Sequence, residues 1–198
     1  MLPVSFFLRP DVARISRELL GKMMFTRVGH GPVTGGIIVE TEAYGGVADR
    51  ASHAYGNRRT KRTEVMFRRG GIAYIYLCYG IHSLFNIITN VADIPDAVLI
   101  RAIQPIHGIN VMLKRRRKTS LHRSLAAGPG VLSQALGIGL SHNGIGVAGN
   151  VIWLEPGIQI QPAQIAAGPR IGVQYAGRDA RRSWRFWVRD SECVSRVP

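Results

Sequence analysis

Short apolar runs alternate with turn-forming residues along the chain, and this pattern predicts strands joined into hairpins. Two runs, the first at residues 23–25 and the second opening at Val33, flank the turn Gly29-His30-Gly31-Pro32. Two more, residues 72–77 and 84–89, flank Tyr79-Gly80. Further strands are predicted at residues 97–103, 151–154 and 184–188. Because hairpins pair neighbouring strands, we expect a mainly antiparallel sheet.

Helical spacing occurs in fewer places. Val12, Ile15 and Leu19 recur at the helical period, with Asp11 as a start signal and Gly21 as a stop. Further helices can begin after His107-Gly108 and at Gly128-Pro129-Gly130, although the second segment can also be a simple turn. The expected fold class is α+β, a single domain with a curved, mainly antiparallel β-sheet surrounded by helices.

Length and composition favour one domain over residues 1–198, since no linker-like segment divides the chain. The composition is 46% hydrophobic, which is enough for one core. No run approaches the ~18 apolar residues that a membrane helix needs. We therefore expect a soluble protein with no membrane partner and no targeting segment at its N-terminus. We also expect a monomer.

A net charge of +14 is the strongest compositional signal. It exceeds what solubility requires and favours a polyanionic partner, either nucleic acid or an anionic membrane surface. Cys78 and Cys193 lie far apart without metal-ligand spacing, so neither a disulfide framework nor a metal site is expected, and no cofactor is implied.

Two segments carry much of this charge. Residues 45–69 lose all periodicity and are rich in arginine, and long loops inside compact domains are uncommon unless they are functional or disordered. Between Asp96 and Glu155 there is no acidic residue, while Arg115 and Arg116 belong to a basic run. Such a run is often only a solvated helix end, but the overall excess of charge favours contact with phosphates.

Candidate chemistry is concentrated where residues 35–44 end. An apolar strand there runs into two carboxylates, and alternation places Glu40 and Glu42 on one face, with Ile37, Val39 and Thr41 on the other. Two acids on one strand face lie at roughly the separation found in retaining sugar hydrolases. A protein of charge +14 suits a neutral glycan poorly, however, and metal-dependent hydrolysis lacks clustered Asp or His.

Arg101 is the one charge in the apolar run 97–103, and an unpaired charge in a core is very costly. It therefore needs a partner. Glu42 could serve only as this partner, or it could act on a substrate, and the residues alone leave both possibilities open.

Taken in order, several segments resemble the alkyladenine (3-methyladenine) DNA glycosylase family. They are Glu40-Thr41-Glu42-Ala43-Tyr44, Ala51-Ser52-His53, Arg62-Thr63-Glu64-Val65-Met66-Phe67, Tyr74-Ile75-Tyr76-Leu77-Cys78-Tyr79-Gly80, Leu99-Ile100-Arg101-Ala102, Gly128-Pro129-Gly130, Gln134-Ala135-Leu136, Pro169-Arg170-Ile171-Gly172-Val173 and Trp184-Arg185-Phe186. No single motif is specific, but the ordered series covers nearly all of the chain.

The resemblance implies a reaction and two catalytic residues. Glu42 would activate a water that attacks the anomeric carbon of a flipped-out nucleotide, and Arg101 would hold the carboxylate, the water or a sugar phosphate. A carboxylate suits this task because it can orient the water and oppose the positive charge of an oxocarbenium-like state.

The same resemblance implies a base pocket and a wedge. Tyr44, His53 and Tyr76 would hold the extruded base between aromatic faces, and Asn86 would crowd the 2-amino group of guanine. Tyr79, at the tip of a hairpin, would fill the space that the base leaves in the duplex. Without the resemblance, Tyr76 would be read as core, Asn86 as a buried structural amide and His53 as surface.

Contacts with the DNA backbone are expected from Arg62, Arg115, Arg116 and Gly130. Val131 stands where the family commonly has a lysine, so that contact is absent or is taken over by neighbouring arginines. His82, two residues past Gly80, occupies a variable position that could alter the preferred lesion.

The function that follows is a monofunctional base-excision-repair DNA glycosylase. It would release alkylated adenine, hypoxanthine or ethenoadenine from double-stranded DNA and leave an abasic site. Lyase activity needs an amine nucleophile, and the chain's only lysines, Lys22, Lys61, Lys114 and Lys118, lie outside the predicted core strands of the site. The alternative is a noncatalytic RNA- or tRNA-binding module. A cytoplasmic, nucleoid-associated location is expected if the source is bacterial, and a nuclear one if it is eukaryotic.

Overall fold

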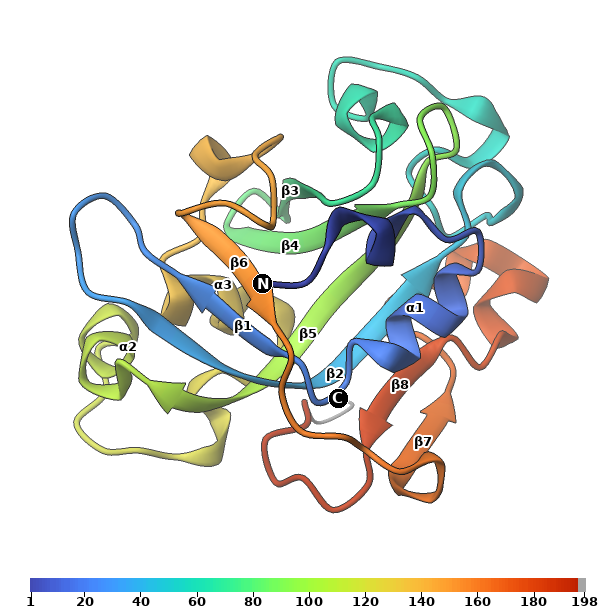
Figure 1. Ribbon diagram of the computed structural model, residues 1–198. Helices are drawn as coiled ribbons and strands as arrows, with labels where there is room; N and C mark the ends of the chain where they lie inside the picture. Colours follow the sequence, from blue (N-terminus) through green and yellow to red (C-terminus); the bar gives the residue numbers. More distant parts are fainter. Residues whose placement is uncertain (196–198) are drawn as a thin grey trace.

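Both predicted hairpins are present in the computed structural model, which describes residues 1–195 (Figure 1). Strand β1 (Met23–Thr26) pairs with β2 (Thr34–Tyr44), and β3 (Ile72–Cys78) pairs with β4 (His82–Thr89). Tyr79 and Gly80 both have positive φ at the tip of the second hairpin, the backbone that a tight connection requires. The hairpin predictions are therefore confirmed.

These strands belong to one curled sheet with the order β3-β4-β5-β2-β1-β6. The remaining strands are β5 (Asp96–His107), β6 (Ile152–Glu155), β7 (Ile165–Gly168) and β8 (Arg185–Val188). Strand β8 joins β2 at one side and β7 at the other. Every strand pairing within residues 1–195 is antiparallel, so the predicted α+β class with an antiparallel sheet is confirmed.

Strand β2 changes partner halfway along its length. Residues 34–37 pair with β1, residues 40–42 pair with β8, and β5 runs along the other edge. Backbones approach closely here: a Cβ on Gly36 would lie 2.2 Å from the carbonyl oxygen of Gln104. The register with β5 shifts between Ile38 and Glu40 and again between Glu40 and Thr41, which marks a β-bulge.

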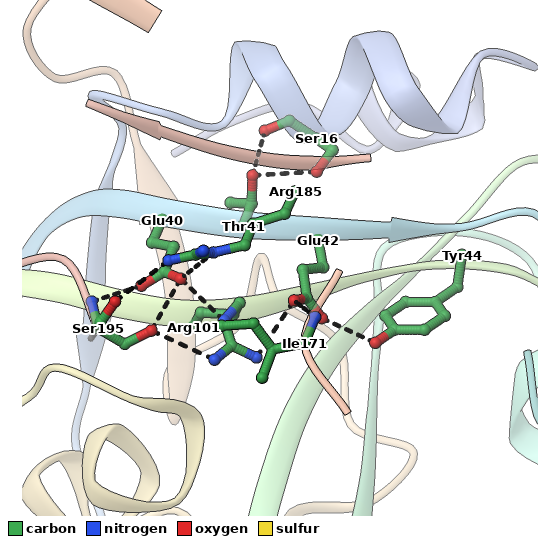
Figure 2. Close-up of polar contacts among 9 residues, drawn as sticks. All are labelled: Ser16, Glu40, Thr41, Glu42, Tyr44, Arg101, Ile171, Arg185 and Ser195. Carbon is green, nitrogen blue, oxygen red and sulfur yellow. Dashed lines mark hydrogen bonds and ion pairs between the residues drawn. The ribbon is translucent and has the colours of Figure 1, made fainter. Parts of the chain in front are cut away.

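This bulge corrects one expectation about β2. Ile37 and Val39 are expected on the packing face, and Val39 is indeed buried at 2% exposure. The β2 side chains in the main hydrophobic cluster are nevertheless Ile38 and Ala43, because the bulge interrupts strict alternation. The expected separation beyond the bulge is confirmed. Figure 2 shows Glu40 and Glu42 on one side of β2, while Thr41 points to α1.

Three α-helices within residues 1–195 pack around the sheet: α1 (Val12–Glu18), α2 (Ile109–Arg116) and α3 (Pro129–Leu136). The Asp11 carboxylate caps α1 by accepting from the Arg14 N–H at 2.9 Å, as the sequence predicted. All three helices contribute to the main hydrophobic core. No described helix has the length and apolar composition needed to cross a membrane.

Most of the other regular segments are short 3-10 helices. They are η1 (Val4–Leu8), η2 (Gly46–Ala48), η3 (Tyr55–Asn57), η4 (Glu64–Phe67), η5 (Arg123–Leu125), η6 (Leu140–His142), η7 (Pro162–Gln164) and η8 (Gln174–Arg181). The basic segment 45–69 is a loop built on three of these helices, and its Met66 and Phe67 are buried against Tyr74. It is therefore an ordered loop.

Candidate active site

A cavity of about 510 Å³ opens beside the C-terminal half of β2. Seven of the residues singled out from the sequence line it, namely Tyr44, His53, Arg62, Tyr76, Tyr79, Asn86 and Arg101. They come from β2, the basic loop, the β3–β4 hairpin and β5. The fold thus brings together residues that span almost 60 positions of the chain.

Glu42 is fully buried directly behind the wall of this cavity. Its Oε1 accepts from the Ile171 N–H at 2.8 Å and lies 3.3 Å from Nη1 of Arg101. Its Oε2 accepts from the Tyr44 hydroxyl at 2.8 Å (Figure 2). Since a carboxylate oxygen can accept two hydrogen bonds, Oε2 keeps one acceptor position beyond these contacts.

Tyr44 connects the cavity to the carboxylate. Burial, and then the neighbouring negative charge of Glu42, raise the pKa of Tyr44 well above its ordinary value. The phenol therefore stays protonated and serves as a hydrogen-bond donor to Glu42. The Tyr44 ring lines the cavity, and its hydroxyl orients the Glu42 carboxylate. A molecule bound in the cavity would therefore contact the same residue that positions the carboxylate.

Arg101 has the carboxylate partners that its position in β5 required. Its Nε donates to Glu40 at 2.9 Å, and its Nη1 lies 3.3 Å from Glu42. Burial lowers the pKa of Arg101, and the carboxylates of Glu42 and Glu40 raise it by more, so the guanidinium stays charged. The expectation of a buried ion pair is confirmed.

Glu40 is occupied by structural contacts and does not face the cavity. Its Oε1 accepts from Arg101, from Nε of Arg185 at 2.7 Å and from Oγ of Ser195 at 2.8 Å, and its Oε2 accepts from the Ser195 N–H at 2.7 Å. It is fully buried and does not line the cavity. This arrangement does not suit a two-carboxylate sugar hydrolase, and Glu40 is a support for Arg101.

His53 stands edge-on to the ring of Tyr76, with centroids 4.6 Å apart. Its Nδ1 lies 2.9 Å from the Tyr74 hydroxyl, and its Nε2 lies 3.4 Å from Nη2 of Arg62. Burial, and then the charges of Arg62 and Arg58, lower the pKa of His53 to about 4. The imidazole is therefore neutral near neutral pH. Because Arg62 can only donate, Nε2 accepts and the ring proton sits on Nδ1.

Tyr76 and Asn86 also line the cavity. The guanidinium carbon of Arg62 lies 5.1 Å from the centre of the Tyr76 ring, a cation–π distance. Asn86 is buried, and its Nδ2 donates to the carbonyl oxygens of Tyr74 at 3.2 Å and Leu84 at 3.3 Å. Its amide is thus held rigidly by the β3–β4 hairpin. The roles assigned to both residues stay predictions.

Tyr79 protrudes from the hairpin tip at the mouth of the cavity and is 92% exposed. A tyrosine of this exposure contributes little to the core, so a packing explanation is removed. Ile81 beside it is also exposed. The geometry fits the wedge role, which stays a prediction.

The predicted phosphate contacts are distributed unevenly. Arg62 lies at the cavity rim, but Arg115 donates to Thr34 and to the carbonyl of Ala135, and Arg116 donates to Gln134. Both α2 arginines therefore also tie α2 to its neighbours. Gly130 lies in the first turn of α3, where an added Cβ would be 3.0 Å from His82.

Sequence reasoning missed the roles of four buried residues around the site. Arg185 and Ser195 hold Glu40, and Asp49 forms a buried ion pair with Arg170. An excess of arginine in apolar segments was a usable signal, because each such residue needs a carboxylate. The sequence held no signal for which acid would meet which arginine.

The site combines an aromatic cavity with a buried carboxylate and arginine behind it, in a chain of net charge +14, and this combination suits an enzyme that acts on nucleic acid. The model of the family described as methylpurine-DNA glycosylase (MPG) matches residues 5–192. Curated relatives that carry the name 3-methyladenine DNA glycosylase cover nearly the whole chain. They include proteins of Bacillus licheniformis (42% identical, over 98% of this chain and 96% of the relative), Chlamydia felis (45%, over 94% and 95%) and Myxococcus xanthus (44%, over 100% and 94%).

The chain belongs to the methylpurine-DNA glycosylase family. It is thus a hydrolase of N-glycosyl bonds whose substrate is DNA. The resemblance drawn from the ordered motifs is confirmed, and the alternative of a noncatalytic RNA-binding module finds no support.

Proposed function

We propose that the protein removes damaged purines from double-stranded DNA as a monofunctional glycosylase of base-excision repair. Its substrates are alkylated adenine and hypoxanthine, with ethenoadenine as a further candidate. The names of its relatives refer to 3-methyladenine, and this proposal carries that substrate class to this chain. The enzyme acts as a monomer, and in a bacterial source it works in the cytoplasm in association with the nucleoid.

The observation that carries the proposal is the placement of Glu42. The carboxylate is held by Ile171, Arg101 and Tyr44 behind the cavity wall, with one acceptor position left on Oε2. A water bound there would be oriented by a fixed base. As the C1′–N bond breaks, its electron pair leaves with the purine, the water oxygen bonds to C1′, and the water proton passes to Glu42. The negative carboxylate also opposes the positive charge that develops on the sugar.

The cavity supports base flipping as the mode of access. An enzyme that acts on a base within a duplex must take it out of the stack, and aromatic faces replace the lost stacking. Tyr44 and Tyr76 supply such faces on the cavity walls, His53 adds a neutral edge, and Tyr79 at the mouth would enter the vacated space. Asn86 would crowd the 2-amino group of guanine.

The lysines support a monofunctional reaction. A lyase forms a Schiff base through an amine at the reacting carbon. All four lysines lie within the described part of the chain, and none of them lines the cavity. Hydrolysis would therefore end at an abasic site with an intact strand.

A base-release panel tests this function. Wild-type protein is incubated with duplexes that contain one hypoxanthine, 3-methyladenine, ethenoadenine or unmodified guanine, and the free base and strand integrity are measured separately. The proposal expects release of damaged purines, no release of guanine, and strand scission only after alkali. Absence of release from every damaged duplex would refute it, and scission without alkali would refute the monofunctional assignment.

A further inference from the structure

Arg170 lies behind the active site in a fully buried ion pair. Its side chain and that of Asp49 are both 0% exposed, and the two form a two-point contact in which Nη2 donates to Oδ1 at 2.9 Å. The guanidinium also donates to the carbonyl oxygens of Ala43 at 2.8 Å and Asp179 at 3.0 Å. A planar fork held on several sides has a fixed orientation, which a flexible ammonium would lack.

The guanidinium also packs on the ring that orients Glu42. Its central carbon lies 4.8 Å from the Tyr44 centroid and 5.3 Å from one ring of Trp184. Tyr44 lines the cavity and Arg170 does not, so the guanidinium supports Tyr44 from the side away from the cavity. The Tyr44 hydroxyl that donates to Glu42 is therefore placed by a ring that Arg170 holds.

A second connection runs through the backbone. Ile171, the next residue, gives its N–H to Oε1 of Glu42 at 2.8 Å. Arg170 bonds to the carbonyl of Ala43, which lies between Glu42 and Tyr44 on β2. The same guanidinium thus ties residues 170–171 to the strand beside the carboxylate that Ile171 contacts.

We propose that Arg170, held by Asp49, is a positioning residue for Glu42: it fixes both the Tyr44 hydroxyl and the Ile171 N–H on the carboxylate. Two of the three groups that contact Glu42 then depend on one buried ion pair. This inference rests on the proposed role of Glu42. A misplacement of about 1 Å at a reacting group can cost on the order of 100-fold in rate, so loss of the fork should slow base release more than it weakens DNA binding.

The first test does not depend on activity. The amide of Ile171 is followed by NMR hydrogen exchange in wild type, Arg170→Lys and the nearly isosteric Asp49→Asn. Leu154→Ala, at a buried position on the remote strand β6, controls for general loss of stability. We expect selective loss of Ile171 protection, by about tenfold or more, in the two ion-pair variants. The proposal would be overturned if Ile171 protection in the ion-pair variants stays at the wild-type level, or if it falls equally in Leu154→Ala. If one ion-pair variant fails to fold, the other still gives this result.

The second test uses single-turnover base release from a hypoxanthine duplex. Arg170→Lys is expected to lower the rate about tenfold while the affinity for the lesion duplex changes by less than about threefold. Tyr44→Phe removes one of the bonds that Arg170 supports, so the double variant should lose less than the product of the two single losses, whereas Arg170→Lys and Leu154→Ala should be independent.

The outcomes separate this proposal from the proposed function. A wild-type protein that releases no damaged base refutes the function, and the exchange measurement still decides whether Arg170 positions Ile171. An active wild type whose rate survives Arg170→Lys within twofold, or whose losses multiply independently with Tyr44→Phe, refutes the positioning role alone.

Discussion

Replacing His53 by asparagine should make folding less sensitive to acid. Burial and nearby arginines lower the pKa of His53 from 6.5 to about 4. As the pH falls below 6.5, the unfolded chain therefore takes up a proton at this position while the folded protein does not. The folded state therefore has its full stability above pH 6.5, the pKa of His53 in the unfolded chain. It loses stability progressively as the pH falls toward about 4, the pKa of His53 in the folded protein.

The size of the effect follows from these two pKa values. Between about pH 8 and about pH 5, the difference between 6.5 and about 4 predicts a loss of about 2 kcal/mol of unfolding free energy from His53 alone. His53→Asn lacks this titration and retains a polar group beside Tyr74. It should therefore lose about 2 kcal/mol less than wild type over the same interval.

Urea unfolding of both proteins at the two pH values measures this difference. Burial raises the pKa of Asp96 to about 6, so Asp96 favours the folded state as the pH falls, against the trend from His53. That contribution is shared by both proteins and cancels in the comparison. Equal acid losses in wild type and His53→Asn would refute the inference that the pocket holds a neutral imidazole.

Three further predictions concern the DNA interface and the reaction. Because Tyr79 is 92% exposed, Tyr79→Ala should change the free energy of unfolding by less than about 0.5 kcal/mol but slow base release at low enzyme concentration. Leu140→Ala, at another exposed position, is the control. Unchanged kinetics of Tyr79→Ala at low enzyme would rule out the wedge role. Affinity for duplex DNA should fall steeply with salt, and Arg62→Gln should reduce the slope of log K against log salt by about 1; a flat wild-type response would contradict a phosphate-dominated interface. Borohydride should trap no covalent complex between the enzyme and a damaged duplex, since no lysine lines the cavity; a trapped complex would overturn the hydrolytic route.

Much of the fold was predictable because turn chemistry is local. Gly29-His30-Gly31-Pro32 and Tyr79-Gly80 marked both hairpins, and the capping Asp11 marked the start of α1. Strand β7 was not predicted, because Ile165–Gly168 is short and its alanines and glycine carry little strand preference. It exists because β8 pairs with it.

For the site, the sequence indicated that a buried arginine needs a partner, but not which residue the partner is. A lone arginine in an apolar strand required a partner, and Arg101 has two carboxylates. The pairing of Asp49 with Arg170 joins residues 121 positions apart, and that of Glu40 with Arg185 joins residues 145 positions apart. Tertiary structure alone decides such pairs. The bulge at Ile38–Glu40 likewise lies where the other edge of β2 passes from β1 to β8, which no local pattern in the sequence indicates.

Buried residues in the loop 137–149 were also not predictable from the sequence. The glycine-rich stretch 137–149 suggests an exposed loop from its composition, yet Ile138 and Val147 are 5% and 1% exposed. Backbone contacts between this stretch and the start of β3, such as the Gly144 N–H to Ala73, hold it against the core. The composition thus indicated the turns correctly, but it did not indicate that apolar side chains between them are buried.

The central claim is that Glu42 activates the water that releases the base. Its most direct test is single-turnover release from a hypoxanthine duplex at saturating enzyme, comparing wild type with Glu42→Gln after lesion binding by both is verified. Since a general base typically contributes on the order of 10²–10⁴-fold, the account predicts a loss of at least about 100-fold with binding retained. Equal release by both proteins would contradict it.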